Sequence, residues 1–206
     1  MIAIVDYGMG NNGSIKNMFK KIGVNSIITD NAEDLVKAEK IILPGVGKFD
    51  NGINNLKKMG LTEILNKKVI DEKTPILGIC LGMQLMSEIS EEGGNLHGLG
   101  WVDAEVRRFD FNRGQNKDLK IPHMGWNTVK HIRKHSLFSQ MFEKSRFYFV
   151  HSYYMVCRDP YDIVTTTYHG MSFVSTIAKD NIFGVQFHPE KSHKFGMKLL
   201  SNFAVL

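Results

Sequence analysis

The sequence predicts an α/β protein with an open, doubly wound, mixed sheet that becomes richer in antiparallel strands in its second half. Three observations indicate this class. Short apolar strands alternate with amphipathic helices before residue 90, strand patterns dominate between residues 104 and 187, and a helical pattern closes the chain. The length of 206 residues fits one compact domain with elaborations, so we predict a single domain over residues 1–206.

The first half repeats a strand–helix–strand pattern, which implies parallel strands covered on both faces. The strands predicted from β-branched and aliphatic runs are residues 2–5, 26–29, 40–43 and 75–79. Apolar residues at helical spacing from Ile15 to Ile22 predict a helix that ends at Gly23. Further helices are expected between residues 53 and 65 and over residues 82–90.

The second half contains β-branched and aromatic runs between turn signals, and antiparallel or mixed pairing is expected there. The predicted strands are residues 104–109, 125–129, 147–155, 163–168, 173–178 and 182–187. The polar segment 111–118 is expected to be a flexible loop, and residues 191–203 have the spacing of a last helix.

Composition narrows the function classes. No apolar run approaches the ~20 residues that span a bilayer, and residues 1–5 are better explained as a first strand than as a signal peptide, so a soluble cytoplasmic protein is expected. The net charge is +5, but lysine and arginine are scattered among acidic residues, which favours an acidic protein partner over nucleic acid. We expect neither a metal nor another cofactor, because the histidines and two cysteines lack metal-ligand spacing.

Cys80 is the strongest candidate for a catalytic residue. It lies between Gly78 and Gly82, where an apolar strand runs into a helix, and this pattern is typical of a nucleophile elbow. A helix N-terminus favours the thiolate, whose ordinary pKa is ~8.5. A buried, structural cysteine is the alternative, and it does not explain the two glycines.

A cysteine nucleophile needs a base, and the base needs an acceptor that fixes its tautomer. The last predicted strand ends at His188-Pro189-Glu190, since proline cannot continue a central strand. His188 and Glu190 should therefore lie at the carboxyl edge of the sheet, where doubly wound folds place their clefts. We predict a Cys80–His188–Glu190 triad.

Acyl transfer also needs donors for the oxyanion that forms. The strand at residues 40–43 opens into Pro44-Gly45-Val46-Gly47, whose glycines allow backbone amides to turn towards a ligand. We expect one donor from the amide of Val46 or Gly47 and the other from Leu81, the residue after the nucleophile.

A different function is suggested by Gly8, Gly10 and Gly13, which form a G-x-G-x-x-G pattern between a strand and a helix. Asp30 follows the next strand, where a ribose-binding acid would lie. A nucleotide-binding oxidoreductase is thus an alternative, although it gives no reason for the cysteine elbow or the His-Pro-Glu sequence. A non-catalytic regulatory subunit is a further alternative, and the presence of both Cys80 and His188 disfavours it.

Together these motifs resemble the class I glutamine amidotransferases, and within them the glutaminase subunits of imidazole glycerol phosphate synthase. The matching segments are residues 6–11, 43–47, 78–84, 122–127, 148–153 and 184–192, and the resemblance covers essentially the whole chain. It implies a flavodoxin-like fold and hydrolysis of glutamine through a Cys80 thioester. It also implies transfer of the ammonia to a (β/α)₈ cyclase partner in a heterodimer that serves histidine biosynthesis.

The same resemblance implies roles for further residues. The positions expected around the glutamine are Gln84, Tyr148, Ser152 and Tyr153, and those expected near the partner or the ammonia exit are Met124, Trp126 and Lys191. Residues 146–149 and 191–196 are also similar to paralogues that supply ammonia for amidination of surface sugars. The acceptor of the ammonia therefore has two alternatives.

Overall fold

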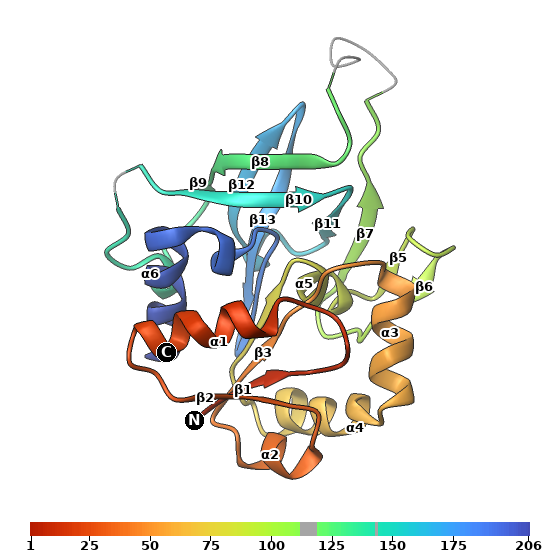
Figure 1. Cartoon of the computed structure of the whole chain (residues 1–206). Coiled ribbons are helices and arrows are strands. Elements are labelled where there is room, and N and C mark those ends of the chain that lie inside the picture. Colours follow the sequence, from red (N-terminus) through yellow and green to blue (C-terminus); the bar gives the residue numbers. More distant parts are fainter. Residues whose placement is uncertain (112–118, 143) are drawn as a thin grey trace.

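A mixed sheet of twelve strands runs through the molecule in the computed structural model, which describes residues 1–111, 119–142 and 144–206 (Figure 1). Its parallel part consists, in spatial order, of β2 (Ser26–Thr29), β1 (Ile2–Val5), β3 (Lys40–Leu43), β4 (Ile76–Ile79) and β14 (Ile182–Val185). All four residues of β1 are buried, as expected of a parallel strand covered on both faces.

Helices cover the two faces of these parallel strands, which confirms the doubly wound prediction. One face is covered by α1 (Asn12–Lys21) and α6 (His193–Ala204), because Ile4 belongs to the same apolar cluster as Phe19 and Leu200. The other face is covered by α2 (Ala32–Lys37), α3 (Phe49–Lys58), α4 (Leu61–Asn66) and α5 (Leu81–Leu85). A π-helix, η1 (Lys67–Asp71), continues α4.

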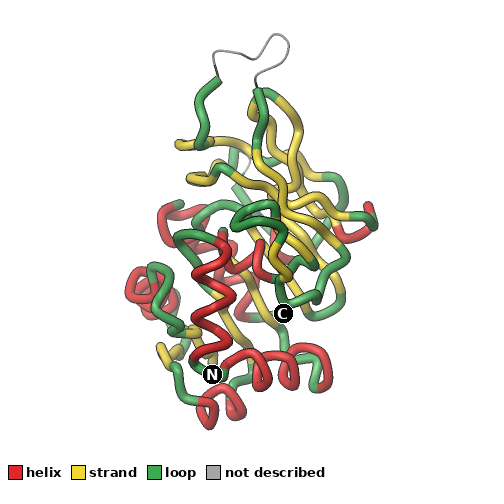
Figure 2. Tube along the Cα trace, turned by 90° about the vertical axis from the view of Figure 1, so that its right-hand side faces the viewer, coloured by secondary structure: helices red, strands yellow, loops and turns green. Residues whose placement is uncertain are grey.

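The antiparallel part of the sheet begins where β13 (Met171–Lys179) pairs with β14. The strands beyond it are β11 (Tyr153–Cys157), β7 (Ala104–Arg108), β5 (Ile89–Ser90) and β6 (Leu96–His97), while β12 (Ile163–His169) and β9 (Lys130–His131) branch from β13. Their pairs are antiparallel, except that β5 runs parallel to β7. Figure 2 shows that most helices surround the strands of one half of the molecule, while the other half consists mainly of strands and loops.

A separate two-stranded sheet is formed by β8 (His123–Thr128) and β10 (Arg146–His151), which are antiparallel and place Tyr148 opposite Trp126. It lies above the parallel strands in Figure 1. The two sheets are joined at His188, just after β14, which bridges to Tyr148.

Several predicted boundaries were wrong. Residues 147–155 form two strands, because the chain breaks at Ser152, whose carbonyl accepts a hydrogen bond from the Phe109 amide at 3.0 Å. The helix expected over residues 82–90 ends after Leu85, where the Ser87 hydroxyl bonds the Gln84 carbonyl and residues 89 and 90 enter the sheet. Helix α2, which was not predicted, follows the N-cap residue Asn31, whose side chain accepts from the Glu33 amide. Residues 112–118 of the predicted flexible loop lie outside the described residues.

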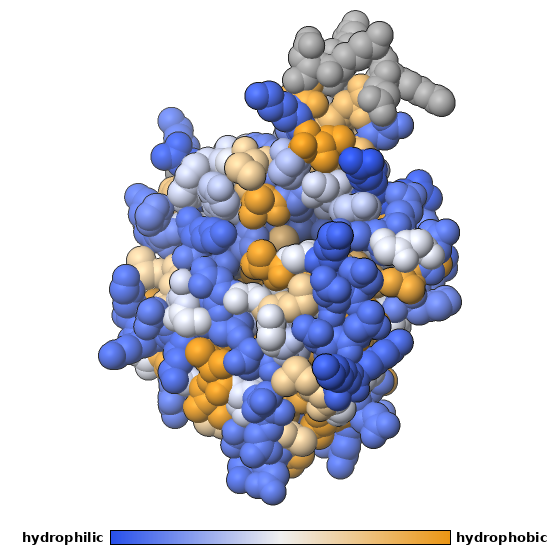
Figure 3. Space-filling model, turned by 45° about the vertical axis from the view of Figure 1, so that its right-hand side comes forward, coloured by the Kyte–Doolittle hydropathy of each residue, from blue (hydrophilic) through white to orange (hydrophobic). Residues whose placement is uncertain are grey.

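The surface in Figure 3 is mostly hydrophilic, with hydrophobic residues in small separate patches. Within the described part of the chain, no helix has the length and apolar character required to cross a bilayer. The remaining short helices are η2 (Ser136–Phe138), η3 (Pro160–Asp162) and η4 (Pro189–Lys191).

Candidate active site

The candidate site lies at the carboxyl ends of β3, β4 and β14, three neighbouring parallel strands. Pro44–Gly47 follows β3, Cys80 follows β4, and His188 comes shortly after β14, so the sheet order brings the three segments together. A pocket of about 260 Å³ opens there. The sequence-predicted residues that line it are Val46, Gly47, Cys80, Leu81, Gln84, Ser152, Tyr153 and His188.

Cys80 has the backbone conformation of a nucleophile elbow. Its φ of 53° and ψ of −108° lie outside the regions that residues other than glycine favour. The turn is possible because both flanking residues are glycines. A Cβ atom on Gly82 would lie 1.8 Å from the Leu43 carbonyl oxygen, and one on Gly78 would lie 2.7 Å from the Met83 amide. The Cys80 side chain is thereby directed into the pocket at the start of α5.

Gln186, a residue that the sequence reasoning missed, also contacts the Cys80 sulfur. Its Nε2 donates to Sγ at 3.6 Å, and its Oε1 accepts from Gln84 Nε2 at 2.9 Å. Gln186 is fully buried. The signal was its position two residues before His188, because alternate residues of an extended segment point to the same side. A donor at this distance stabilises a thiolate.

His188 connects Cys80 to Glu190. Its Nδ1 lies 2.8 Å from Glu190 Oε1, and both side chains are 1% exposed. Burial lowers the pKa of His188, but the charge of Cys80 and the hydrogen bonds to Cys80 and Glu190 outweigh it and raise that pKa to about 10. These interactions favour the protonated imidazole beside the sulfur.

The Pro44–Gly47 loop lies directly on the start of α5. A Cβ on Gly45 would lie 2.7 Å from both the Gly82 amide and Leu81 Cβ, and Gly47 has a φ of +126°. Among the described residues, nothing accepts a hydrogen bond from the amides of Val46 or Gly47. Both residues line the pocket, so the loop can turn an amide towards a ligand bound at Cys80.

Tyr148 is not among the residues that line the pocket, and its place around the glutamine stays a prediction. It alternates with Phe147 and Phe149, whose rings are buried in the core, so its own ring points to the opposite side of the small sheet. There it lies edge-on to Trp126, with 6.2 Å between ring centroids, and 5.7 Å below the Lys191 ammonium.

Glu92 lines the pocket and was missed by the sequence reasoning. Its Oε2 accepts from the Phe49 amide at 3.0 Å, which fixes the carboxylate beside the start of α3. Burial raises the pKa of Glu92, and the Phe49 N–H opposes that rise. The sequence around Glu91 and Glu92 does not predict that Glu92 lines the pocket. This position depends on how the loop between β5 and β6 folds against α3.

The three residues predicted near the partner or the ammonia exit lie outside the pocket. Met124 and Trp126 are 62% and 41% exposed on the small sheet. The Arg146 guanidinium lies 5.5 Å from the Trp126 ring centroid, and the His193 ring stacks on it at 5.5 Å with an interplanar angle of 8°. We call this surface the Trp126 face; it comprises Met124, Trp126, Arg146, Tyr148, Lys191 and His193.

The G-x-G-x-x-G segment is not packed in the way that a dinucleotide-binding loop is. A Cβ on Gly10 would lie 2.9 Å from the Pro44 side chain, so this glycine packs against the Pro44–Gly47 loop. Gly13 lies within α1 and has nothing within 4 Å, whereas the third glycine of a dinucleotide site permits close packing of helix on strand. In the described parts of the chain, no group of three or more His, Cys, Asp or Glu side chains could hold a metal ion.

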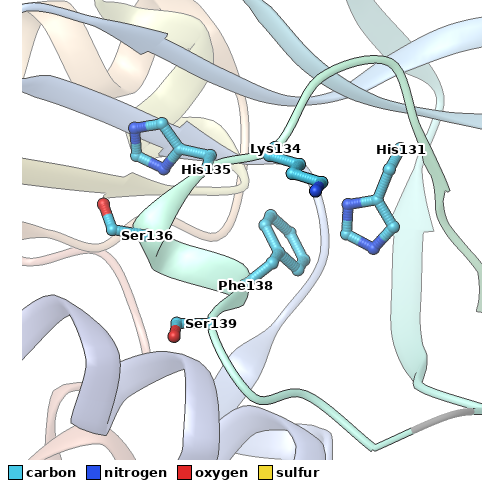
Figure 4. A pocket seen from close by; sticks show the side chains of 6 residues that line it. All are labelled: His131, Lys134, His135, Ser136, Phe138 and Ser139. Carbon is cyan, nitrogen blue, oxygen red and sulfur yellow. The ribbon is translucent and has the colours of Figure 1, made fainter.

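A second hollow, of about 550 Å³, lies around η2 (Figure 4). Its lining residues are His131, Lys134, His135, Ser136, Phe138 and Ser139. His135 Nδ1 already accepts from the Leu137 amide at 3.2 Å, and burial lowers the pKa of His135. None of the described residues that line this hollow is a cysteine or carries a carboxylate, so the smaller pocket at Cys80 is the better candidate for hydrolysis.

Comparison with known proteins places the chain in a family. The sequence model of the class-I glutamine amidotransferases matches residues 3–206, and the chain belongs to this family. A protein of Methanococcus maripaludis named imidazole glycerol phosphate synthase subunit HisH 2 is 60% identical over 203 residues, 98% of each chain. A protein of the same name from Pseudomonas aeruginosa is 49% identical over the full length of both. The family resemblance predicted from the sequence is thus confirmed.

Solved structures have the same fold at low sequence identity. A structure described as a glutamine amidotransferase is 17% identical, with a TM-score of 0.72 over 100% of both chains. PurLQS from Thermotoga maritima is 18% identical, with a TM-score of 0.71 over 98% of this chain and 96% of that one. These likenesses confirm the predicted α/β fold class.

Proposed function

We propose that the chain is the glutaminase subunit of an imidazole glycerol phosphate synthase, which releases ammonia from glutamine and passes it to a (β/α)₈ cyclase subunit. The observation that carries the chemistry is the alignment of Cys80, His188 and Glu190 at a pocket of about 260 Å³. The identity of 60% to a subunit with this name supports the choice of reaction.

In the proposed reaction, the Cys80 thiolate attacks the carboxamide carbon of glutamine and forms a tetrahedral oxyanion. The amide of Leu81 and that of Val46 or Gly47 donate to this oxygen. His188 gives its proton to the departing nitrogen, the carbon–nitrogen bond breaks, and ammonia and a thioester result. Neutral His188 then takes a proton from water, whose oxygen attacks the thioester. Glutamate leaves, and the thiolate and the imidazolium are restored.

Glu190 is assigned to orienting His188 and stabilising its charge. Glu190→Gln should keep a hydrogen-bond partner for Nδ1 but remove a negative charge that raises the pKa of His188. Because the leaving ammonia needs the protonated imidazole, the alkaline limb of the rate profile should move to lower pH, and kcat should fall about tenfold. Glutaminase rates between pH 6 and 10 measure this. An alkaline limb at the wild-type position would contradict the role of Glu190.

Recognition of glutamine is assigned to the remaining pocket residues. Glu92 contributes a carboxylate to the pocket lining. A carboxylate is a suitable partner for the α-ammonium group of an amino acid. Gln84, Ser152 and Tyr153 complete the lining. Since the reaction needs Cys80 as a free thiol, we also place the protein in the reducing cytoplasm.

The Trp126 face is proposed to dock the cyclase. Exposed Met124 and Trp126 have the character of interface anchors, and three basic side chains surround them, which suits an acidic partner surface. Within this face, Tyr148 is linked to the site, because its carbonyl accepts from the His188 amide at 2.8 Å. Ammonia released at Cys80 would thus leave past Tyr148 and Lys191.

One observation favours a second acceptor for the ammonia. Arg146 and His193 belong to the segments that are similar to sugar-amidinating paralogues, and both pack on the same exposed ring, Trp126. The residues that differ between the two pathways would then lie where a partner is chosen. In this alternative, the glutaminase chemistry is unchanged and an amidinating synthetase takes the ammonia.

Reconstitution with each class of partner tests the proposal. The chain is mixed with a cyclase and its phosphoribulosyl substrate, or with a sugar-amidinating synthetase and its sugar, and glutamine-dependent product is measured. We expect product only with the cyclase. Product only with the synthetase would assign the chain to the paralogous pathway, and no glutamine hydrolysis with either partner would favour a non-catalytic subunit.

A further inference from the structure

Tyr7 has a buried hydroxyl group to which the proposed reaction assigns no role. The side chain is fully buried at the start of the first glycine loop, and its Oη donates to the Pro44 carbonyl oxygen at 2.5 Å. The Tyr7 backbone carbonyl accepts from Asn55 Nδ2 at 3.0 Å, which ties the residue to α3. Tyr7 therefore links a helix to the residue where the Pro44–Gly47 loop begins.

The Tyr7 hydroxyl is in close contact with the backbone of the Pro44–Gly47 loop. A Cβ on Gly45 would lie 2.8 Å from Tyr7 Oη and 2.7 Å from the Gly82 amide, so the Gly45 backbone fits between the hydroxyl and the start of α5. Met9, two residues after Tyr7, places its Cε 2.6 Å from the position of a Cβ on Gly47. The first glycine loop thus contacts both ends of the segment that carries the Val46 and Gly47 amides.

The hydroxyl can only act as a neutral donor. Burial raises the pKa of Tyr7 far above its usual value, and the nearby charge of Cys80 acts in the same direction. Tyr7 therefore does not exchange protons with the thiol in the working pH range. The Pro44 carbonyl is fixed by this bond, and the orientation of the peptide groups that follow depends on where that carbonyl points.

We propose that Tyr7 is a positioning residue for the oxyanion loop: its hydroxyl anchors the Pro44 carbonyl so that an amide of Val46 or Gly47 can reach the oxyanion. This inference rests on the proposed function. It also gives a role to the segment of Gly8 and Gly10, whose pattern alone suggested a nucleotide site. The Tyr7 hydrogen bond fixes the loop at Pro44, while the Val46 and Gly47 amides have no acceptor among the described residues.

The test is Tyr7→Phe in the full chain, with Tyr161→Phe as the matched control, because Tyr161 is 81% exposed. Glutamine hydrolysis is measured for each chain without a partner and with the cyclase and its ligand. Alkylation of Cys80 by iodoacetamide is measured in parallel. Alkylation needs the thiolate but no oxyanion donor. We expect kcat to fall roughly tenfold. This is less than the ~10²–10³-fold loss in kcat that follows removal of an oxyanion donor, because the variant misplaces the donor and does not remove it. KM and the alkylation rate should stay within about twofold, and Tyr161→Phe should match wild type.

Two outcomes would overturn the inference: an unchanged kcat in Tyr7→Phe, or an alkylation rate that falls in step with kcat, which would mean that the hydroxyl acts on Cys80. If the variant is less stable, the comparison is repeated at a temperature at which its circular dichroism matches wild type. Loss of the proposed function is distinguishable, because wild-type chain that hydrolyses no glutamine with any partner would reject that function whatever Tyr7→Phe does.

Discussion

Cys80→Ala should lower glutamine hydrolysis by at least ~10³-fold, because without the sulfur no thioester can form and only the binding and oxyanion groups remain. The cyclase complex should keep its activity with ammonium salts, since the nucleophile serves only to release ammonia. The alanine should be tolerated structurally, because the elbow depends on Gly78 and Gly82 and on the Cys80 amide, which donates to the Val185 carbonyl at 2.8 Å. Both activities are measured in the reconstituted complex.

The matched control is Cys157→Ala. Burial raises the pKa of Cys157 to about 12, with Asp162 and Asp159 acting in the same direction, so this thiol is inert at neutral pH. It lies at the end of β11, away from the pocket lining. Glutaminase activity should stay within about twofold of wild type. Glutamine-dependent turnover that survives in Cys80→Ala and is lost in Cys157→Ala would move the nucleophile to the other cysteine.

Local patterns were sufficient to predict most of the architecture. Runs such as residues 2–5 and 40–43 are apolar throughout because parallel strands are buried on both faces, and the structure has strands with these bounds. The elbow at Cys80 was predictable for a steric reason, since only glycines fit beside it. The convergence of Cys80 and His188 followed from the rule that parallel strands end at one edge.

Other features depend on tertiary packing and were not predictable. The break at Ser152 separates two strands that belong to different sheets, although their sequence reads as one β run. Tyr148 was expected around the glutamine from the family resemblance alone, and the burial of Phe147 and Phe149 turns its ring to the other side of the small sheet. Glu92 reaches the pocket from a loop whose place is set by α3. No sequence spacing encodes these contacts.

The isolated chain should hydrolyse glutamine slowly, and the cyclase with its phosphoribulosyl ligand should accelerate it by roughly 10²–10³-fold, the cost of one missing oxyanion donor. The structural reason is the Pro44–Gly47 loop. Its hinge is tied to Tyr7, but the Val46 and Gly47 amides have no acceptor among the described residues, and the Val46 side chain is 46% exposed. Two glycines allow the peptide rotation that would aim an amide at the oxyanion.

A partner changes the rate only if it favours one of the two loop states, so its ligand should bind more tightly when glutamine or an analogue occupies the Cys80 pocket. The measurements are steady-state glutaminase rates of the chain alone, with cyclase, and with cyclase plus ligand, and the affinity of the ligand with and without a glutamine analogue. Full activity of the isolated chain would contradict the switch. Acceleration without a reciprocal change in ligand affinity would place the effect in the chemical steps, and the loop would then not be the element that couples the two sites.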